Sequence, residues 1–173
     1  MKYVKALLAI AILAAAVWYI RRSFYPPYRC NIVAMNVHRN TNILDKSLNP
    51  LQISFGARTN LELLRPCVEQ VPQSVTLQML AGANHTFLGQ HEEARQRYLT
   101  AMQWDQRPEL HHELGRTLLH LGREKEAYDH LVQACVVFPM WTDALPDQIR
   151  ADMYARIQQI RGPEGWSLRR KRR

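Results

Sequence analysis

Small and apolar positions follow one another in the same order in two stretches of this chain. The shared set runs Gly82, Leu88, Gly89, Ala94 and Ala101 in the first stretch, and Gly115, Leu121, Gly122, Ala127 and Ala134 in the second. In each stretch a Leu-Gly pair separates two segments of helical period, which predicts a helix hairpin. Hairpins of this size bury their apolar faces only by stacking, so the pattern predicts an all-α repeat array with an open surface for partners.

The spacing of these residues can be compared with a known repeat. Tetratricopeptide repeats are about 34 residues long and read W-x2-L-G-x2-Y, then A-x3-F, then P. The second stretch gives His111-x2-Leu114-Gly115-x2-Leu118, Ala127-x3-Leu131 and Pro139, and the first gives Gln78-x2-Ala81-Gly82-x2-His85, Ala94-x3-Tyr98 and Pro108. Both lack the first aromatic, and the first stretch has a histidine at the second aromatic position. The chain resembles tetratricopeptide-repeat (TPR) proteins, with full repeats expected over residues 74–106 and 107–139.

Partial helical patterns flank the two repeats. Thr59 and Glu62 have the spacing of a capping box, which predicts the second helix of a degenerate preceding repeat. At the other end, Pro146 suits the start of a helix. The apolar positions of that helix would cover the end of the array: Ile149, Met153, Ile157 and Ile160. By contrast, residues 31–57 show no sustained periodicity, which predicts an irregular segment.

The pattern at the amino terminus predicts a helix separate from the repeats. Tyr3–Ile20 is apolar except for Lys5, and eighteen helical residues span about 27 Å, close to the hydrocarbon core of a bilayer. Two aromatics and two arginines suit a membrane interface: Trp18, Tyr19, Arg21 and Arg22. A cleaved signal peptide with its cleavage site at residues 14–16 is the alternative, but the aromatics and arginines that follow favour a retained single transmembrane helix.

The side of the membrane on which the repeats lie depends on few charges. Arg21, Arg22 and Arg29 follow the apolar segment, against Lys2 and Lys5 before it, which favours cytoplasmic repeats. The Trp-Tyr-x-Arg-Arg end also resembles bacterial TPR proteins of lipopolysaccharide assembly, and that resemblance implies cytoplasmic repeats. We therefore expect a single-pass protein of the bacterial inner membrane, with a periplasmic repeat domain as the alternative.

The chain thus divides into four predicted parts. They are a transmembrane anchor (1–22), a connector (23–57), a TPR-like helical domain (58–160) and a basic tail (161–173). The net charge of +8 comes mainly from the two ends. Five basic residues end the tail: Arg169, Arg170, Lys171, Arg172 and Arg173. They could form a solvated end or bind anionic lipid headgroups, and the same charge would also suit nucleic acid, which is a less specific interpretation.

Residues that could carry chemistry are few. Cys30, Cys67 and Cys135 lack C-x-x-C spacing, although Cys30 and Cys67 would be the pair to test for a disulfide in an exported domain. The segment from His111 resembles a zinc-protease motif, but Arg116 stands where the second metal ligand would be. We therefore expect no catalytic residue, metal or cofactor.

The TPR resemblance implies a binding groove, because in this family the first helix of each hairpin lines the concave face. The register places eight residues there: Met79, Ala83, Thr86, Phe87, His112, Arg116, Leu119 and His120. Apolar anchors with one cation and two histidines suit an acidic, apolar peptide or helix of a partner protein. In the alternative, extra helices cover Phe87 and Leu119 and leave no open groove.

These features lead us to expect a non-enzymatic, membrane-anchored TPR adaptor. It would bind other proteins, membrane proteins among them, and assemble or stabilise a membrane complex. Two alternatives stay open: a lipid- or nucleic-acid-binding protein that acts through the basic tail, and an accessory subunit of an envelope-biogenesis enzyme.

Overall fold

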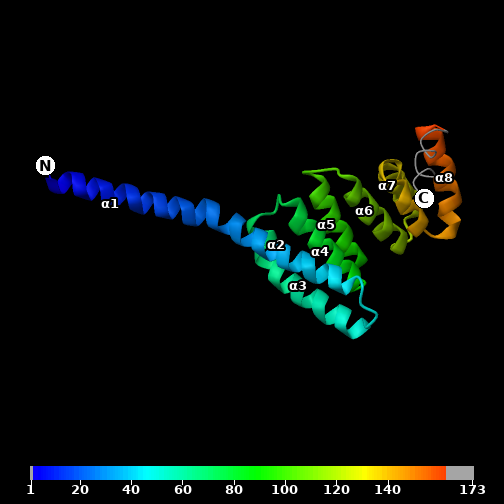
Figure 1. The fold of residues 1–173 in the computed structure, drawn as a ribbon, viewed down its shortest axis with the longest axis horizontal. Helices are drawn as coiled ribbons and strands as arrows, with labels where there is room; N and C mark the ends of the chain where they lie inside the picture. Colours follow the sequence, from blue (N-terminus) through cyan, green and yellow to red (C-terminus); the bar gives the residue numbers. More distant parts are fainter. Residues whose placement is uncertain (1, 163–173) are drawn as a thin grey trace, which may run out of the picture.

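The computed structural model describes residues 2–162, and every regular element in that range is helical (Figure 1). The basic tail, with Arg169–Arg173, lies outside the described residues. In chain order the elements are α1 (Lys2–Tyr19), η1 (Ile20–Phe24), α2 (Tyr25–Leu44), α3 (Pro50–Gln70), α4 (Val75–Phe87), α5 (His91–Met102), α6 (Pro108–His120), α7 (Glu124–Val137), η2 (Pro139–Ala144) and α8 (Asp147–Arg161). The all-α class is therefore confirmed.

Six of these helices form three stacked hairpins. The pairs α2/α3, α4/α5 and α6/α7 pack closely within each hairpin, and α3 with α4 and α5 with α6 join one hairpin to the next. Figure 1 shows the hairpins following one another from α2 to α7, with α8 at the end beyond α7. The expected repeat array is confirmed, and it contains a hairpin more than the two full repeats read from the sequence.

The repeated glycines have two physical roles. A Cβ at Gly82 would lie 2.5 Å from the ring of Tyr98, and one at Gly115 would lie 2.6 Å from Leu131. These mid-helix glycines therefore allow the two helices of a hairpin to approach closely. Gly89 and Gly122 end α4 and α6 with φ values of 70° and 71°, a left-handed conformation that glycine adopts without steric cost.

The stretch expected to be an irregular connector, residues 23–57, is instead mostly helical. It contains α2 and the first part of α3, and the side chain of Asn49 caps α3 by accepting hydrogen bonds from the amides of Leu51 and Gln52. The capping box expected at Thr59 and Glu62 is also wrong, because Thr59 lies inside α3 and donates to the carbonyl of Phe55. The buried stripe of α2 escapes a search for apolar periodicity because it includes small and polar residues: Cys30, Ala34, Val37, Thr41 and Leu44.

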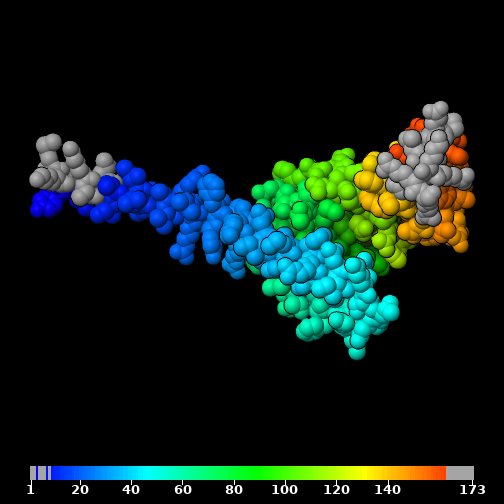
Figure 2. Space-filling model, viewed as in Figure 1, coloured from blue at the N-terminus to red at the C-terminus, as the bar shows by residue number. Residues whose placement is uncertain are grey.

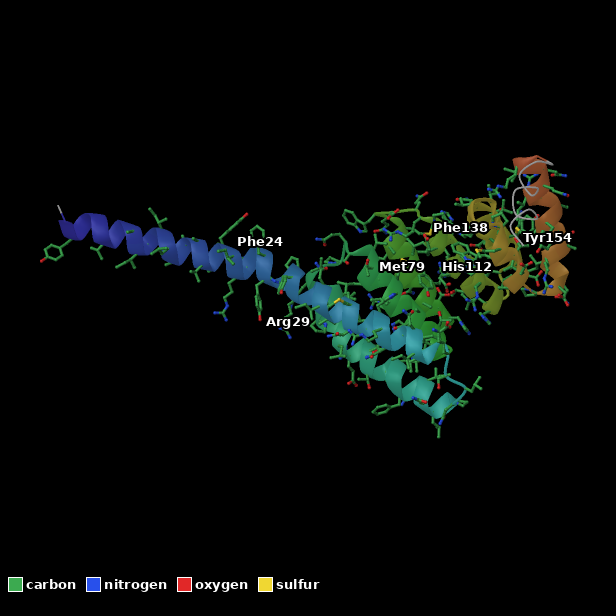
Figure 3. The ribbon with its side chains drawn as sticks, in the orientation of Figure 1. Phe24, Arg29, Met79, His112, Phe138 and Tyr154 are labelled. Carbon is green, nitrogen blue, oxygen red and sulfur yellow. A yellow bond between two sulfur atoms is a disulfide. The ribbon has the colours of Figure 1, made fainter. Side chains whose placement is uncertain are left out.

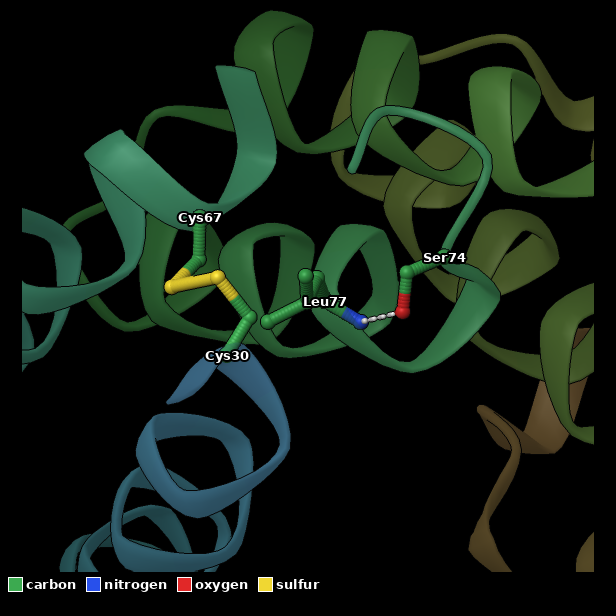
Figure 4. Close-up of a disulfide and its surroundings, with 4 residues drawn as sticks. All are labelled: Cys30, Cys67, Ser74 and Leu77. Atoms are coloured by element: carbon green, nitrogen blue, oxygen red, sulfur yellow. Dashed lines mark hydrogen bonds between the residues drawn. A yellow bond between two sulfur atoms is a disulfide. The ribbon is translucent and has the colours of Figure 1, made fainter. Parts of the chain in front are cut away.

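A disulfide between Cys30 and Cys67 links α2 to α3 (Figure 4). Both cysteines are buried in a cluster to which Leu77 and Leu80 of α4 also belong. The third cysteine, Cys135, is a buried free thiol in the main core. The first hairpin is thus held by a covalent bond as well as by its packing on α4.

Buried amides tie the same three helices together. The amide of Asn60 on α3 donates to the side-chain oxygen of Asn84 on α4 at 2.9 Å, and the Asn84 amide donates to the hydroxyl of Thr41 on α2 at 3.1 Å. Both asparagines are fully buried. Since an unpaired buried amide is costly, this network favours one register of the first hairpin on the second.

The predicted transmembrane helix over Tyr3–Ile20 is wrong. Among residues 2–162 no helix combines the length and apolar composition needed to cross a membrane. Lys2 and Lys5 leave an apolar run, residues 6–20, that is shorter than the roughly 20 residues of a typical span. The helix continues through η1 into α2, the first helix of the array.

The predictions that depended on this span change with it. The inner-membrane location is wrong as well, membrane anchoring is not supported, and the interface role of Trp18, Tyr19, Arg21 and Arg22 loses its basis. In the structure the guanidinium of Arg22 lies 5.6 Å from the Trp18 ring centroid, and the ring of Tyr19 meets Phe24 edge-on. These aromatic residues contact the helix that carries them.

Candidate interaction surface

The eight residues of the predicted groove come from α4 and α6, the first helices of the second and third hairpins. The two helices contact each other directly. Arg116 and His120 are exposed and His112 is buried, while the other five are partly buried: Met79, Ala83, Thr86, Phe87 and Leu119. Seven of the eight are therefore accessible to some degree, and we call these seven the α4/α6 face.

The apolar members of this face also contribute to the fold. Met79 and Leu119 pack against the main core, which limits how far they can move toward a partner. Thr86 donates its hydroxyl proton to the carbonyl of Gly82 at 3.1 Å. The face is therefore a rigid surface, and binding a partner would cost little conformational entropy here.

His112 is covered by aromatic residues that the sequence pattern does not point to. Its ring centroid lies 4.7 Å from that of Trp141, which in turn lies 4.7 Å from that of Phe138. Figure 3 labels His112 and Phe138. Trp141 belongs to η2, the short helix that follows the third hairpin. Only 8% of His112 is exposed, so this residue supports the face from below.

Charged groups surround the exposed part of α6. The Oε1 atom of Glu113 lies 3.3 Å from Nδ1 of His112 and 3.8 Å from a guanidinium nitrogen of Arg116. Burial acts to raise the pKa of Glu113, but the hydrogen bond from His112 and the nearby positive charge of Arg116 leave that pKa below its ordinary value. Arg116 keeps 49% of its side chain exposed and most of its donors free.

His120 lies at the end of α6, where it stacks on His91 of α5 with ring centroids 4.5 Å apart and nearly parallel planes. Burial lowers the pKa of His91, and the neighbouring His120 lowers it further. We expect His91 to be neutral near neutral pH. His120 therefore presents an aromatic edge of the face as well as a hydrogen-bonding ring.

The zinc-protease-like segment does not gather metal ligands. Nδ1 of His111 lies 2.9 Å from Nδ1 of His130 on α7, whereas the adjacent His112 turns toward Trp141. Within residues 2–162 there is no group of three or more His, Cys, Asp or Glu residues placed to hold a metal ion. Arg116 occupies the position of the missing ligand and is exposed to solvent.

A second groove, which the sequence pattern does not predict, lies on another side of the array. It has a cavity volume of about 610 Å³ and runs between α3 and α5, with α4 contributing to its wall. Its lining alternates arginine and glutamate along α3, and Arg97 of α5 faces it. The spacing of the charged residues on α3, alternately four and three positions, could have predicted this charged side of the helix. The expected capping box at Thr59 hid it, because it placed the start of the helix nine residues after Pro50, where α3 begins.

Comparison with known proteins bears on the fold. No protein-family model matches the sequence, and no curated protein matches it. Among solved structures, the chain is similar to TTC0263, described as a thermophilic TPR protein from Thermus thermophilus, with a TM-score of 0.57 and 17% sequence identity. The match covers 90% of this chain and 76% of TTC0263. The chain therefore has a TPR-like, all-helical hairpin-repeat fold.

Proposed function

We propose that this chain is a non-enzymatic scaffold that binds a partner protein through the α4/α6 face. The observation that carries the proposal is the grouping of accessible apolar side chains with an exposed arginine on a rigid pair of helices. TPR-like arrays offer extended surfaces of this kind to protein partners. The fold and the residues of the face both support binding of a partner protein.

The partner chemistry follows from the side chains. Met79, Phe87 and Leu119 offer apolar contacts, and Arg116 is held only loosely by Glu113, at 3.8 Å. A carboxylate can form a charge-assisted, two-pronged hydrogen bond with such a guanidinium. We therefore expect a partner segment that presents apolar side chains next to an acidic one.

Replacing Phe87 with alanine together with Arg116→Glu should remove the main partner. The change deletes an aromatic anchor and reverses the charge opposite the acidic residue, and interface energy is usually concentrated in a few such residues. Co-purification of the full chain followed by quantitative mass spectrometry should show a loss of about tenfold or more for that partner.

A matched control removes the same residue types elsewhere. Trp104→Ala with Arg156→Glu deletes an exposed aromatic and reverses an exposed arginine outside the α4/α6 face. This control should retain the partner, and both variants should keep the helicity of the wild type. Retention of the partner by the Phe87/Arg116 variant, or equal loss in the control, would contradict the proposal.

A further inference from the structure

The outward side of α3 carries a regular stripe of exposed residues. Its positions are spaced alternately by four and three along the helix: Leu51, Phe55, Arg58, Glu62, Arg65 and Glu69. Residues with this spacing lie along one side of a helix, where they can contact a second helix together. The buried residues of α3 lie on a different side, so the stripe is not needed for packing within the array.

The charges of the stripe have no partners within the described chain. The ion pairs formed in residues 2–162 all lie between Glu92 and Arg150, from α5 onward, and none involves α3. The apolar end of the stripe is also uncovered, since Phe55 is 76% exposed. In Figure 2 the first half of α3, in cyan to turquoise, lies at an outer edge of the molecule.

The order of the charges is self-complementary. Arg58 and Glu69 are equally far from the midpoint of the four charged residues, which falls between positions 63 and 64, and so are Glu62 and Arg65. When two α3 helices run antiparallel about a two-fold axis at this midpoint, Arg58 faces the partner's Glu69 and Glu62 faces the partner's Arg65. The symmetry repeats both contacts, so every charge of the stripe meets an opposite charge.

One further observation fits this arrangement. All four charged residues of the stripe line the groove of about 610 Å³ between α3 and α5. All four side chains are exposed along this groove, so a second copy of the chain can reach them from solvent.

We propose that two copies of this chain associate through the α3 stripe as an antiparallel, two-fold symmetric pair. The inference is independent of the proposed function, because α3 takes no part in the α4/α6 face. The dimer would carry two such faces and could hold a partner with two binding segments more tightly than one copy could.

Charge-uniform variants of the full chain test the pairing. Arg58→Glu with Arg65→Glu makes the four charged positions acidic, and Glu62→Arg with Glu69→Arg makes them basic. Each variant alone should associate about tenfold or more weakly than the wild type, because like charges then face each other. An equimolar mixture should recover association as a heterodimer, and added salt should weaken it. Sedimentation velocity at micromolar protein measures each case.

The fourfold swap, which combines all four substitutions, restores self-complementarity and should dimerise as the wild type does. Lys125→Glu with Arg156→Glu changes the net charge as much as the acidic variant but lies outside the stripe, so it should leave association unchanged. The proposal is overturned by a monomeric wild type. It is equally overturned if the mixture associates no more strongly than the two variants alone.

Discussion

Replacing Tyr98 with alanine is expected to lower the free energy of unfolding by about 3–5 kcal/mol, the range for deleting a buried aromatic ring. Tyr98 is fully buried in the main core, and its ring fills the space that the missing side chain of Gly82 leaves between α4 and α5. The α4/α5 hairpin would lose its central contact. Chemical denaturation followed by circular dichroism measures the change.

Tyr98→Phe provides the matched control. It keeps the ring and removes only the hydroxyl, which is buried and has no hydrogen-bond partner within residues 2–162, so its cost should be close to zero. If Tyr98→Ala were no more harmful than Tyr98→Phe, the ring would not be filling the space at Gly82, and the packing described for this hairpin would be wrong.

Removing the Cys30–Cys67 disulfide is expected to lower the free energy of unfolding by about 4 kcal/mol. The two cysteines are 37 residues apart, and in the chain-entropy model a cross-link over a loop of that length restricts the unfolded chain by about this amount. Cys30→Ala with Cys67→Ala measures the effect in equilibrium denaturation, since alanine adds no polar group to the buried site.

Reduction supplies an independent check. Wild-type protein refolded with reductant should unfold at nearly the denaturant concentration of the double variant, whereas reductant should not affect the double variant. Cys135, the buried free thiol, is present in every sample and cancels from the comparison. Equal stability of oxidised and reduced wild type would contradict the predicted stabilisation by this bond.

The repeated part of the fold could be predicted because its key residues are chemically distinctive. Glycines at a helix contact and at a helix end recur with fixed spacing, and few other residues can replace them at Gly82, Gly89, Gly115 and Gly122. The first hairpin lacks these markers. In α2 the buried positions are partly a cysteine and a threonine, so the helical period is invisible to a count of large apolar residues.

The spacing of the repeats placed the residues of the α4/α6 face on α4 and α6, but it did not give their exposure. The spacing placed Phe87 and Arg116 on first helices, and both are accessible in the structure. It could not show that Trp141 covers His112, because that contact depends on how η2 folds back after the third hairpin. At the amino terminus, the apolar composition suggested a membrane span, but the uncharged run of residues 6–20 is shorter than the roughly 20 residues of a typical span.

Hydroxyl-radical footprinting of the full chain with and without its co-purified partner tests the central claim most directly. Oxidation of Met79, Phe87 and His120 on the α4/α6 face should fall when the partner binds. Trp104, which is exposed in the loop between α5 and α6, should react equally in both samples. Unchanged oxidation of the three face residues in a saturated complex would contradict the proposed role of this face.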